Sequence, residues 1–163
     1  MKYYRSEEYY REGGWHGTIA MDGGGALMNQ GIHGIGLPLY LMGDPKSVSA
    51  YVRTLVHPIE VEDTAVACVE FQNGALGTII GTTSLNPSSP RVLNVHGTKG
   101  RIQLTEGNIT RWEVEGEEPF SVELEDVGTG QNPTNFSHEL HQRQLLDFIE
   151  AVRTTGLFLT NSL

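Results

Sequence analysis

Residues 21–43 read MDGGGALMNQGIHGIGLPLYLMG, a run of glycines that leads into a long apolar segment. The part from about residue 24 to residue 42 is long for a strand and therefore predicts a helix, with Asp22 as its N-cap. The Gly-Asp-Pro sequence at residues 43–45 predicts the end of this helix. A kink or a break is expected over residues 34–38, where a proline removes one backbone hydrogen bond.

Asn29 and His33 are the polar side chains of this apolar segment, four residues apart. On a helix that spacing places both on one face, with Cβ atoms roughly 5–6 Å apart. A histidine can move a proton near neutral pH, and an amide can orient a hydroxyl or a carbonyl. His33 is therefore a candidate acid/base and Asn29 a candidate substrate contact; a capped or core histidine and an interhelical polar contact are the alternatives. Residues 23–25 are either a substrate-approach loop or a tight turn.

The remainder of the chain reads mostly as short strands with a period of two. Short connections between them indicate mainly antiparallel neighbours. A strand end with a short helix precedes them over residues 3–12, and an amphipathic helix follows over about residues 136–153. The order predicts an α+β domain: a large, mostly antiparallel or mixed β-sheet with helices on one face. The expected strands are residues 48–56, 64–71, 75–83, 90–96, 101–105, 108–114 and 120–124.

Composition narrows the class of protein. The 163 residues carry 11 Lys and Arg against 20 Asp and Glu, a formal charge of −9. This balance argues against nucleic acid and anionic membrane surfaces as partners, and no run of residues reads as a membrane span or a leader. Cys68 stands alone, so an internal disulfide is impossible, and a buried reduced thiol is expected. A single soluble, cytoplasmic domain is the prediction.

Other histidines and carboxylates suggest sites that the spacing does not support. His138 and His141 lie three residues apart without a third ligand, so no metal is expected. Glu62 and Asp63 are neighbours in a strand-like segment, and their side chains point to opposite faces, so they cannot share a substrate. The remaining histidines of the strand-like segments, His57 and His96, are expected to be structural.

A set of motifs in fixed order carries a resemblance to a known family. The chain resembles the C-terminal domain of the Gfo/Idh/MocA oxidoreductases, named for glucose–fructose oxidoreductase and inositol dehydrogenase. The resemblance implies a fold like the C-terminal domain of glyceraldehyde-3-phosphate dehydrogenase. The motifs are Lys2-x-x-Arg5, Tyr9-Tyr10, Trp15-x-Gly17-Thr18, Asp22-Gly-Gly-Gly-Ala-Leu-Met-Asn-Gln-Gly-Ile-His33, Leu41-Met-Gly43, Val61-Glu-Asp-Thr64, Phe71-x-Asn-Gly-Ala-Leu-Gly77, Gly97-Thr-x-Gly100 and Gln144-Leu-Leu-Asp-Phe-Ile-Glu-Ala151.

In this family a separate N-terminal Rossmann domain binds NAD or NADP and supplies a catalytic lysine in a Glu-Lys-Pro motif. The sequence contains neither a Gly-x-Gly-x-x-Gly motif after a strand nor that lysine motif. Residues 1–163 are therefore expected to be one substrate-binding and oligomerisation domain, truncated relative to the family at both ends. No bound cofactor and no turnover are expected of this chain alone.

The family motif Asp-x-x-x-His implies roles for individual residues. His33 matches the histidine, whereas Asn29 stands in place of the aspartate and can orient a hydroxyl but not accept its proton. His16 replaces the arginine of a Trp-Arg-Gly-Thr motif and is expected to line the site. Arg5 and Lys2 are expected to contact the substrate, with solvated surface charges as the alternative. Gly36 stands where many members have an aspartate, which loosens the helix and leaves the substrate open.

The resemblance implies an NAD(P)-dependent oxidoreductase that acts on a secondary alcohol of a sugar, nucleotide sugar or cyclitol. The alternatives are a non-catalytic sugar-binding or assembly module of the same fold, and a non-redox relative such as a biliverdin-reductase-like or regulatory protein. A sheet covered on one side leaves an open face, and residues 65–71 and 75–83 are apolar on both sides. We therefore expect a homo-oligomer through that face.

Overall fold

The computed structural model describes residues 1–120 and 139–154. The chain divides into two compact units, Met1–Ser121 and Val122–Leu163. The second unit contributes α4 (Glu139–Thr154), which confirms the predicted amphipathic helix. The first unit contains, in chain order, β1 (Lys2–Tyr4), α1 (Glu7–Glu12), α2 (Ile19–Asp22), α3 (Ile32–Met42), β2 (Pro45–Arg53), β3 (Thr64–Phe71), β4 (Leu76–Thr82), β5 (Ser84–Ser89), β6 (Val92–Gly97), β7 (Gly100–Thr105) and β8 (Asn108–Val114).

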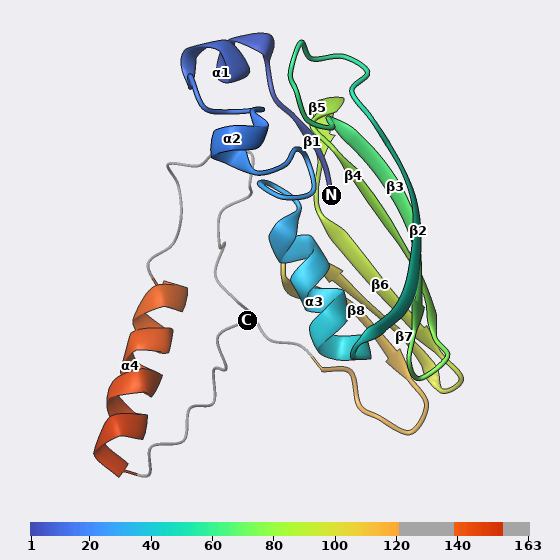
Figure 1. Cartoon of the computed structure of the whole chain (residues 1–163). Helices are drawn as coiled ribbons and strands as arrows, with labels where there is room; N and C mark the ends of the chain where they lie inside the picture. The colour runs from blue at the N-terminus through green and yellow to red at the C-terminus, as the bar shows by residue number, and fades with distance from the viewer. Residues whose placement is uncertain (121–138, 155–163) are drawn as a thin grey trace. The chain divides into compact units, whose positions relative to one another are not determined.

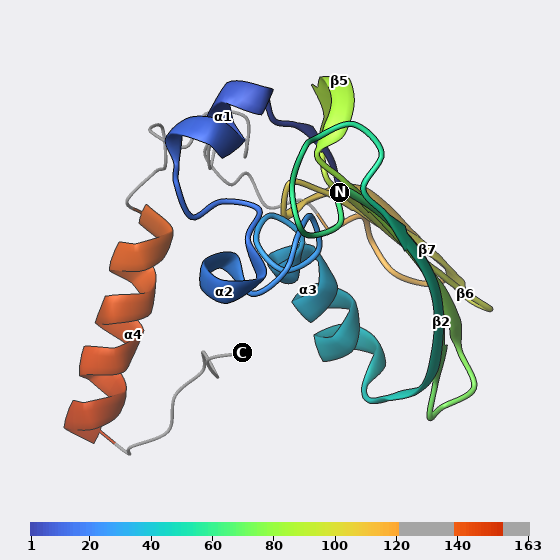
Figure 2. The ribbon, with the colours of Figure 1, turned by 45° about the horizontal axis from the view of Figure 1, so that its top comes forward.

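The strands of the first unit form two sheets. A five-stranded sheet has the order β2-β3-β4-β1-β5, and an antiparallel three-stranded sheet has the order β6-β7-β8. In the larger sheet β1 runs parallel to β4, while the other neighbours are antiparallel. Figures 1 and 2 show α2 and α3 on the same side of the strands. The α+β class with a mostly antiparallel, mixed sheet is thereby confirmed.

The core lies between this sheet and the segment that leads into α3. Every second residue of β3 is buried: Ala65, Ala67, Val69 and Phe71. Gly81 of β4 pairs with Ala65, and a Cβ placed there would lie 2.3 Å from the Leu27 side chain, so this face of the sheet carries the turn before α3.

Cys68 lies on the other face of β3 and is exposed, so the expectation of a buried thiol was wrong. Its neighbours in the strand, Ala67 and Val69, are the buried residues. Because both faces of β3 are apolar, the alternation alone did not show which face is covered.

The long helix begins later than predicted. Residues 26–30 form a turn and α3 begins at Ile32, so Asn29 does not share a helix with His33. Asp22 is not the N-cap of α3 but the last residue of α2. The predicted end is confirmed, since Gly43 closes α3 with a positive φ of 83° and a bond from its N–H to the Leu39 carbonyl. The expected break at the proline is absent, because α3 continues through Pro38.

Glu62 explains why the glycine run is a turn. Its carboxylate accepts hydrogen bonds from the backbone N–H groups of Gly25 (3.0 Å) and Leu27 (3.1 Å), and its carbonyl accepts from Ala26 (2.9 Å). A Cβ on Gly25 would lie 1.8 Å from that carbonyl oxygen, so only glycine permits the approach. The segment is therefore held by a distant carboxylate, together with one turn of backbone bonds from Met28 and Asn29 to the Gly25 carbonyl.

Asp63 holds the connection between β2 and β3. Its side chain is fully buried and accepts hydrogen bonds from the backbone N–H groups of Leu55, Val56 and His57. Burial raises the pKa of this carboxyl, but the hydrogen bonds from the three amides outweigh that effect and leave the pKa of Asp63 below its ordinary value. Glu62 and Asp63 thus have separate structural partners, but the reason inferred from the sequence was wrong, because both residues precede β3 and lie in no strand.

His57 is also structural, as predicted. It is 4% exposed, its ring lies 4.8 Å from that of Tyr10, and its Nε2 lies 3.4 Å from the carbonyl oxygen of Thr83. Thr83 is fully buried and its carbonyl accepts from the N–H of Arg5, so this core supports the start of the chain.

The strand predictions for residues 64–71 and 108–114 agree with β3 and β8, and the strand end with a short helix at the start is confirmed as β1 and α1. β5 and α2 were not predicted. Most of the strand expected over residues 120–124 lies outside the described residues, and so does His138. No helix among the described residues has both the length and the apolar character needed to cross a bilayer.

Candidate functional site

Tyr9 of α1 brings several predicted substrate residues together. Its ring stacks on that of His16 (centroids 4.2 Å apart, planes at 19°), and the Arg5 guanidinium lies 5.4 Å from the ring centroid. The Tyr9 hydroxyl accepts a hydrogen bond from Gln30 Nε2 at 3.1 Å. The side chains of residues 5, 16 and 30, which lie outside α1, therefore meet at one aromatic ring.

His16 contacts two aromatic rings. Besides Tyr9, the ring of Trp15 lies 3.8 Å from it between centroids, and a Cβ on Gly13 would overlap the imidazole. Its Nδ1 is buried and has no hydrogen-bond partner among the described residues. The position favours a role as a wall of the site over that of a surface charge.

Asp22 joins the segment of His16 to the turn of Asn29. Its Oδ2 accepts from the backbone N–H of Gly17 at 2.8 Å, and its Oδ1 accepts from Asn29 Nδ2 at 2.8 Å. Asn29 is half-buried. We define the polar cluster as Arg5, Tyr9, His16, Asp22, Asn29 and Gln30.

His33 lies in the first turn of α3, directly after the turn that carries Asn29 and Gln30. Its side chain is exposed, and it has no hydrogen bond or ion pair within the described part of the chain. Gly31 is the N-cap of α3, and no side chain caps the start of this helix. The imidazole is therefore open to a ligand rather than used in the core, which argues against the structural alternative.

Lys2 does not join the polar cluster. Lys2 pairs with Thr82 of β4. A Cβ placed on the adjacent residue, Gly81, would lie against the side chain of Leu27. Because successive strand residues point to opposite faces, Thr82 and Lys2 face away from the turn before α3. Lys2 is exposed on that face, where the alternative of a solvated charge describes it better.

The tyrosines near the cluster do not offer a base at neutral pH. Burial raises the pKa of both Tyr3 and Tyr10 above the ordinary value. The Tyr10 hydroxyl donates to Thr83 Oγ1 at 2.8 Å, and the Tyr3 hydroxyl donates to Glu106 at 3.5 Å. Both rings are fixed as neutral hydrogen-bond donors, so a histidine is the group suited to proton transfer here.

A small cavity lies beside α3 but does not coincide with the cluster. Its volume is about 80 Å³, and its lining includes Leu27, Gly34, Ile79 and Arg91 but neither Asn29 nor His33. Ligand pockets are usually several times larger, ~300–1,000 Å³. The cavity is a packing gap between α3 and the strands rather than a substrate site.

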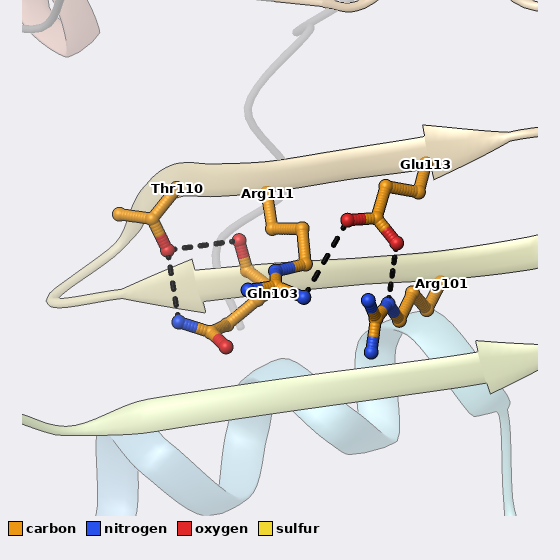
Figure 3. Close-up of polar contacts among 5 residues, drawn as sticks. All are labelled: Arg101, Gln103, Thr110, Arg111 and Glu113. Atoms are coloured by element: carbon orange, nitrogen blue, oxygen red, sulfur yellow. Dashed lines mark hydrogen bonds and ion pairs between the residues drawn. The ribbon is translucent and has the colours of Figure 1, made fainter.

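A second polar group lies on β7 and β8, where two arginines share one glutamate (Figure 3). The Arg101 guanidinium and Arg111 (3.4 Å) both contact the Glu113 carboxylate. The hydrogen bond from Arg101 lowers the pKa of Glu113, and Gln103 donates to Thr110 at 3.2 Å. Such exposed pairs contribute little to stability.

Among the described residues, no group of three or more His, Cys, Asp or Glu side chains could hold a metal ion. The described residues thus include one exposed imidazole, at His33, and one amide held by Asp22, at Asn29. An imidazole can exchange a proton with a hydroxyl, and an amide can hydrogen-bond to one.

The model of the GFO/IDH/MocA C-terminal domain matches residues 1–103, more than half of the chain. The chain belongs to this family. The predicted relationship to the Gfo/Idh/MocA oxidoreductases is confirmed. No curated protein matches the chain significantly.

Two similar solved structures are WlbA dehydrogenases in complex with NADH and UDP-GlcNAcA. That from Bordetella pertussis is 35% identical, with a TM-score of 0.68, over 72% of this chain and 35% of that chain. That from Chromobacterium violaceum is 33% identical, with a TM-score of 0.71, over 90% of this chain and 42% of that chain. A levoglucosan dehydrogenase in complex with NADH and levoglucosan is 28% identical, with a TM-score of 0.52, over 56% and 27% of the two chains. This chain therefore spans less than half the length of each.

The glycine run at residues 23–25 does not fit the pyrophosphate of a dinucleotide. The glycine run at residues 23–25 follows helix α2 rather than a strand, and the Glu62 carboxylate already occupies the N–H groups of Gly25 and Leu27. A pyrophosphate needs such amides free at the start of a helix. These residues can therefore not be assigned to a nicotinamide cofactor.

Asp22, Tyr9 and Gln30 were not predicted as site residues. Asp22 was interpreted as a helix cap, and Tyr9 entered only as part of a motif. The signal that pointed to them was chemical: the amides of Asn29 and Gln30 each require a partner when half-buried. Those partners lie seven and 21 residues away, which a local pattern does not reveal.

Proposed function

We propose that this chain is the substrate-binding part of an NAD(P)-dependent dehydrogenase that oxidises a secondary alcohol of a sugar, nucleotide sugar or cyclitol. The observation that carries the proposal is the open imidazole of His33 directly after the turn in which Asp22 holds Asn29. Membership of the family and the sugar and nucleotide-sugar ligands of the similar dehydrogenases support it.

The residues suit the half of the reaction that concerns the hydroxyl. Oxidation of a secondary alcohol removes a proton from oxygen and a hydride from carbon. His33 would accept the proton, since an imidazole exchanges protons near neutral pH. Asn29 stays neutral and contributes a hydrogen bond, and the rings of Tyr9, His16 and Trp15 offer apolar faces. The hydride acceptor, NAD or NADP, belongs to a part of the enzyme that these residues do not form.

Binding of a nucleotide sugar tests the proposal. We use UDP-GlcNAcA as the nucleotide-sugar probe, UDP as the control for its nucleotide part, and NADH as a second ligand, each by isothermal titration calorimetry. The chain is expected to bind the probe more tightly than UDP and to show no heat with NADH. His33→Ala, which removes the hydrogen-bonding groups of the side chain, should weaken probe binding, whereas His96→Ala, at an exposed histidine of β6, should not.

Tight NADH binding by these residues would contradict the assignment to the substrate side of the enzyme. Probe binding without any turnover, once a nicotinamide-binding domain is supplied, would instead favour the alternative of a non-catalytic sugar-binding or assembly module.

We also propose a cytoplasmic location, because a single cysteine permits no internal disulfide.

We further propose that the open face of the larger sheet joins two or more copies of the chain. The register aligns Tyr51, Val66 and Ile80 across β2, β3 and β4 on the face opposite the buried residues. These side chains are 75%, 45% and 43% exposed, and Cys68 lies in the next row of the same face. An apolar patch of this kind is typical of an interface.

A dimer or higher oligomer is expected by light scattering at micromolar concentration, and Val66→Arg should dissociate it. Cys68 should react slowly with a thiol reagent in the wild type and faster in this variant. Val92→Arg is the matched control, since Val92 is also 45% exposed but lies on β6. A monomeric wild type with a freely reactive thiol would contradict the interface.

A further inference from the structure

Asp22 uses both carboxylate oxygens on segments that carry candidate substrate residues. One oxygen accepts from the N–H of Gly17, next to His16, and the other accepts from Asn29 Nδ2, each at 2.8 Å. Asp22 is itself half-buried at the end of α2. Both partners are donors, so the position requires an acceptor at each end, which among the side chains of this size only a carboxylate provides.

The contact determines which way the Asn29 amide is turned. An ionised carboxylate can only accept hydrogen bonds, so the atom of Asn29 that faces Asp22 must be the NH₂ group. The carbonyl oxygen, Oδ1, then has no hydrogen-bond partner within the described residues. Asn29 therefore presents an acceptor, which suits a hydroxyl hydrogen of a ligand.

We infer that Asp22 is a positioning residue that orients Asn29 to accept a hydrogen bond from a substrate hydroxyl, and that ties this turn to the segment of His16. The inference rests on the proposed function. A hydroxyl has one hydrogen, so the hydroxyl that donates to Asn29 Oδ1 is not the one that gives its proton to His33. The ligand class is accordingly a polyol with at least two hydroxyls rather than an isolated alcohol.

Exchanging the two side chains tests the inference. In Asp22→Asn the oxygen of the new amide can still accept from Gly17, but its NH₂ group faces Asn29. Asn29 must then reverse its own amide, so that its oxygen faces residue 22 and its NH₂ group faces the ligand. The double variant D22N/N29D restores a donor facing an acceptor and returns an acceptor to the ligand side. Glu60→Gln is the control, because Glu60 accepts from the N–H of Ile19 at the other end of α2 and does not contact Asn29.

Calorimetry with the nucleotide-sugar probe should give about tenfold weaker binding for D22N, which corresponds to roughly one hydrogen bond. D22N/N29D should return to within about threefold of the wild type, and E60Q should bind as the wild type does. A role of Asp22 in structure alone would not be rescued by a change at residue 29. Unchanged binding in D22N, or a double variant no better than D22N, would overturn the inference.

Solvent exchange of the Asn29 side-chain NH₂ group, measured by NMR without ligand, separates this inference from the proposed function. Slow exchange is expected in the wild type and in E60Q, and fast exchange in D22N. A wild type that does not bind the probe contradicts the proposed function. Exchange that is equally fast in the wild type and in D22N contradicts the positioning role of Asp22. Slow wild-type exchange that D22N abolishes retains the orientation of Asn29 by Asp22.

Discussion

His33→Asn is expected to lower kcat by about 10²–10⁴-fold in the proposed dehydrogenase, the usual contribution of a positioned acid/base. Asparagine retains hydrogen-bonding groups of similar reach but does not accept a proton at neutral pH. KM should change far less than kcat, because the lost interaction is made in the transition state. Steady-state rates of nicotinamide reduction with the nucleotide-sugar probe measure both constants.

The matched control for this variant is His96→Asn, which replaces an exposed histidine of β6. Its kcat and KM should equal those of the wild type. Equal rates for His33→Asn and the wild type would remove His33 from the chemistry.

Asp63→Ala is expected to lower the free energy of unfolding by roughly 2–5 kcal/mol, because a buried amide left without an acceptor costs about 1–3 kcal/mol and two part-buried amides each lose a hydrogen bond of about 0.5–1.5 kcal/mol. The amides are those of Leu55, Val56 and His57. Their loop packs against Thr83, whose carbonyl accepts from Arg5, so the polar cluster should loosen as well. Urea unfolding followed by circular dichroism measures the change.

The pH dependence of stability follows from the lowered pKa of Asp63. A carboxyl whose pKa is depressed by folding stabilises the protein above its unfolded value, ~4, and loses that contribution as the pH falls toward its folded value. The urea midpoint of the wild type should therefore drop below about pH 4, with a shallower slope in Asp63→Ala. Asp44→Asn is the control, since the side chain of Asp44 is exposed and only its backbone carbonyl accepts a bond, from Gln72. An unfolding free energy within about 0.5 kcal/mol of the wild type in Asp63→Ala would contradict the role of this carboxylate.

The sequence predicted elements whose cause is local. The alternation of residues 64–71 and the Asn-Gly turn that follows predicted β3 and β4, and the Gly-Asp-Pro sequence predicted the end of α3. β5 was not predicted, because Ser84–Ser89 contains polar residues and a proline. A proline is tolerated there because β5 lies at the edge of the sheet.

What the sequence did not reveal depends on contacts between distant segments. The start of α3 was wrong because Glu62 draws the amides of Gly25 and Leu27 into a turn. The polar cluster was predicted in part, through Asn29, His16 and Arg5, but the residues that hold it together lie elsewhere in the chain. Asp22 also accounts for an amide at residue 29, because a carboxylate there would meet a second carboxylate at hydrogen-bonding distance.

A polyol is proposed to bind at the turn of Asn29 and the first turn of α3. The most direct test is to titrate the nucleotide-sugar probe into isotopically labelled chain and to follow the NMR signals of the His33 ring and the Asn29 side-chain amide. We expect both to shift in proportion to saturation, while the ring signals of His96 stay in place. Saturable binding that moves His96 and leaves His33 and Asn29 unchanged would contradict the account.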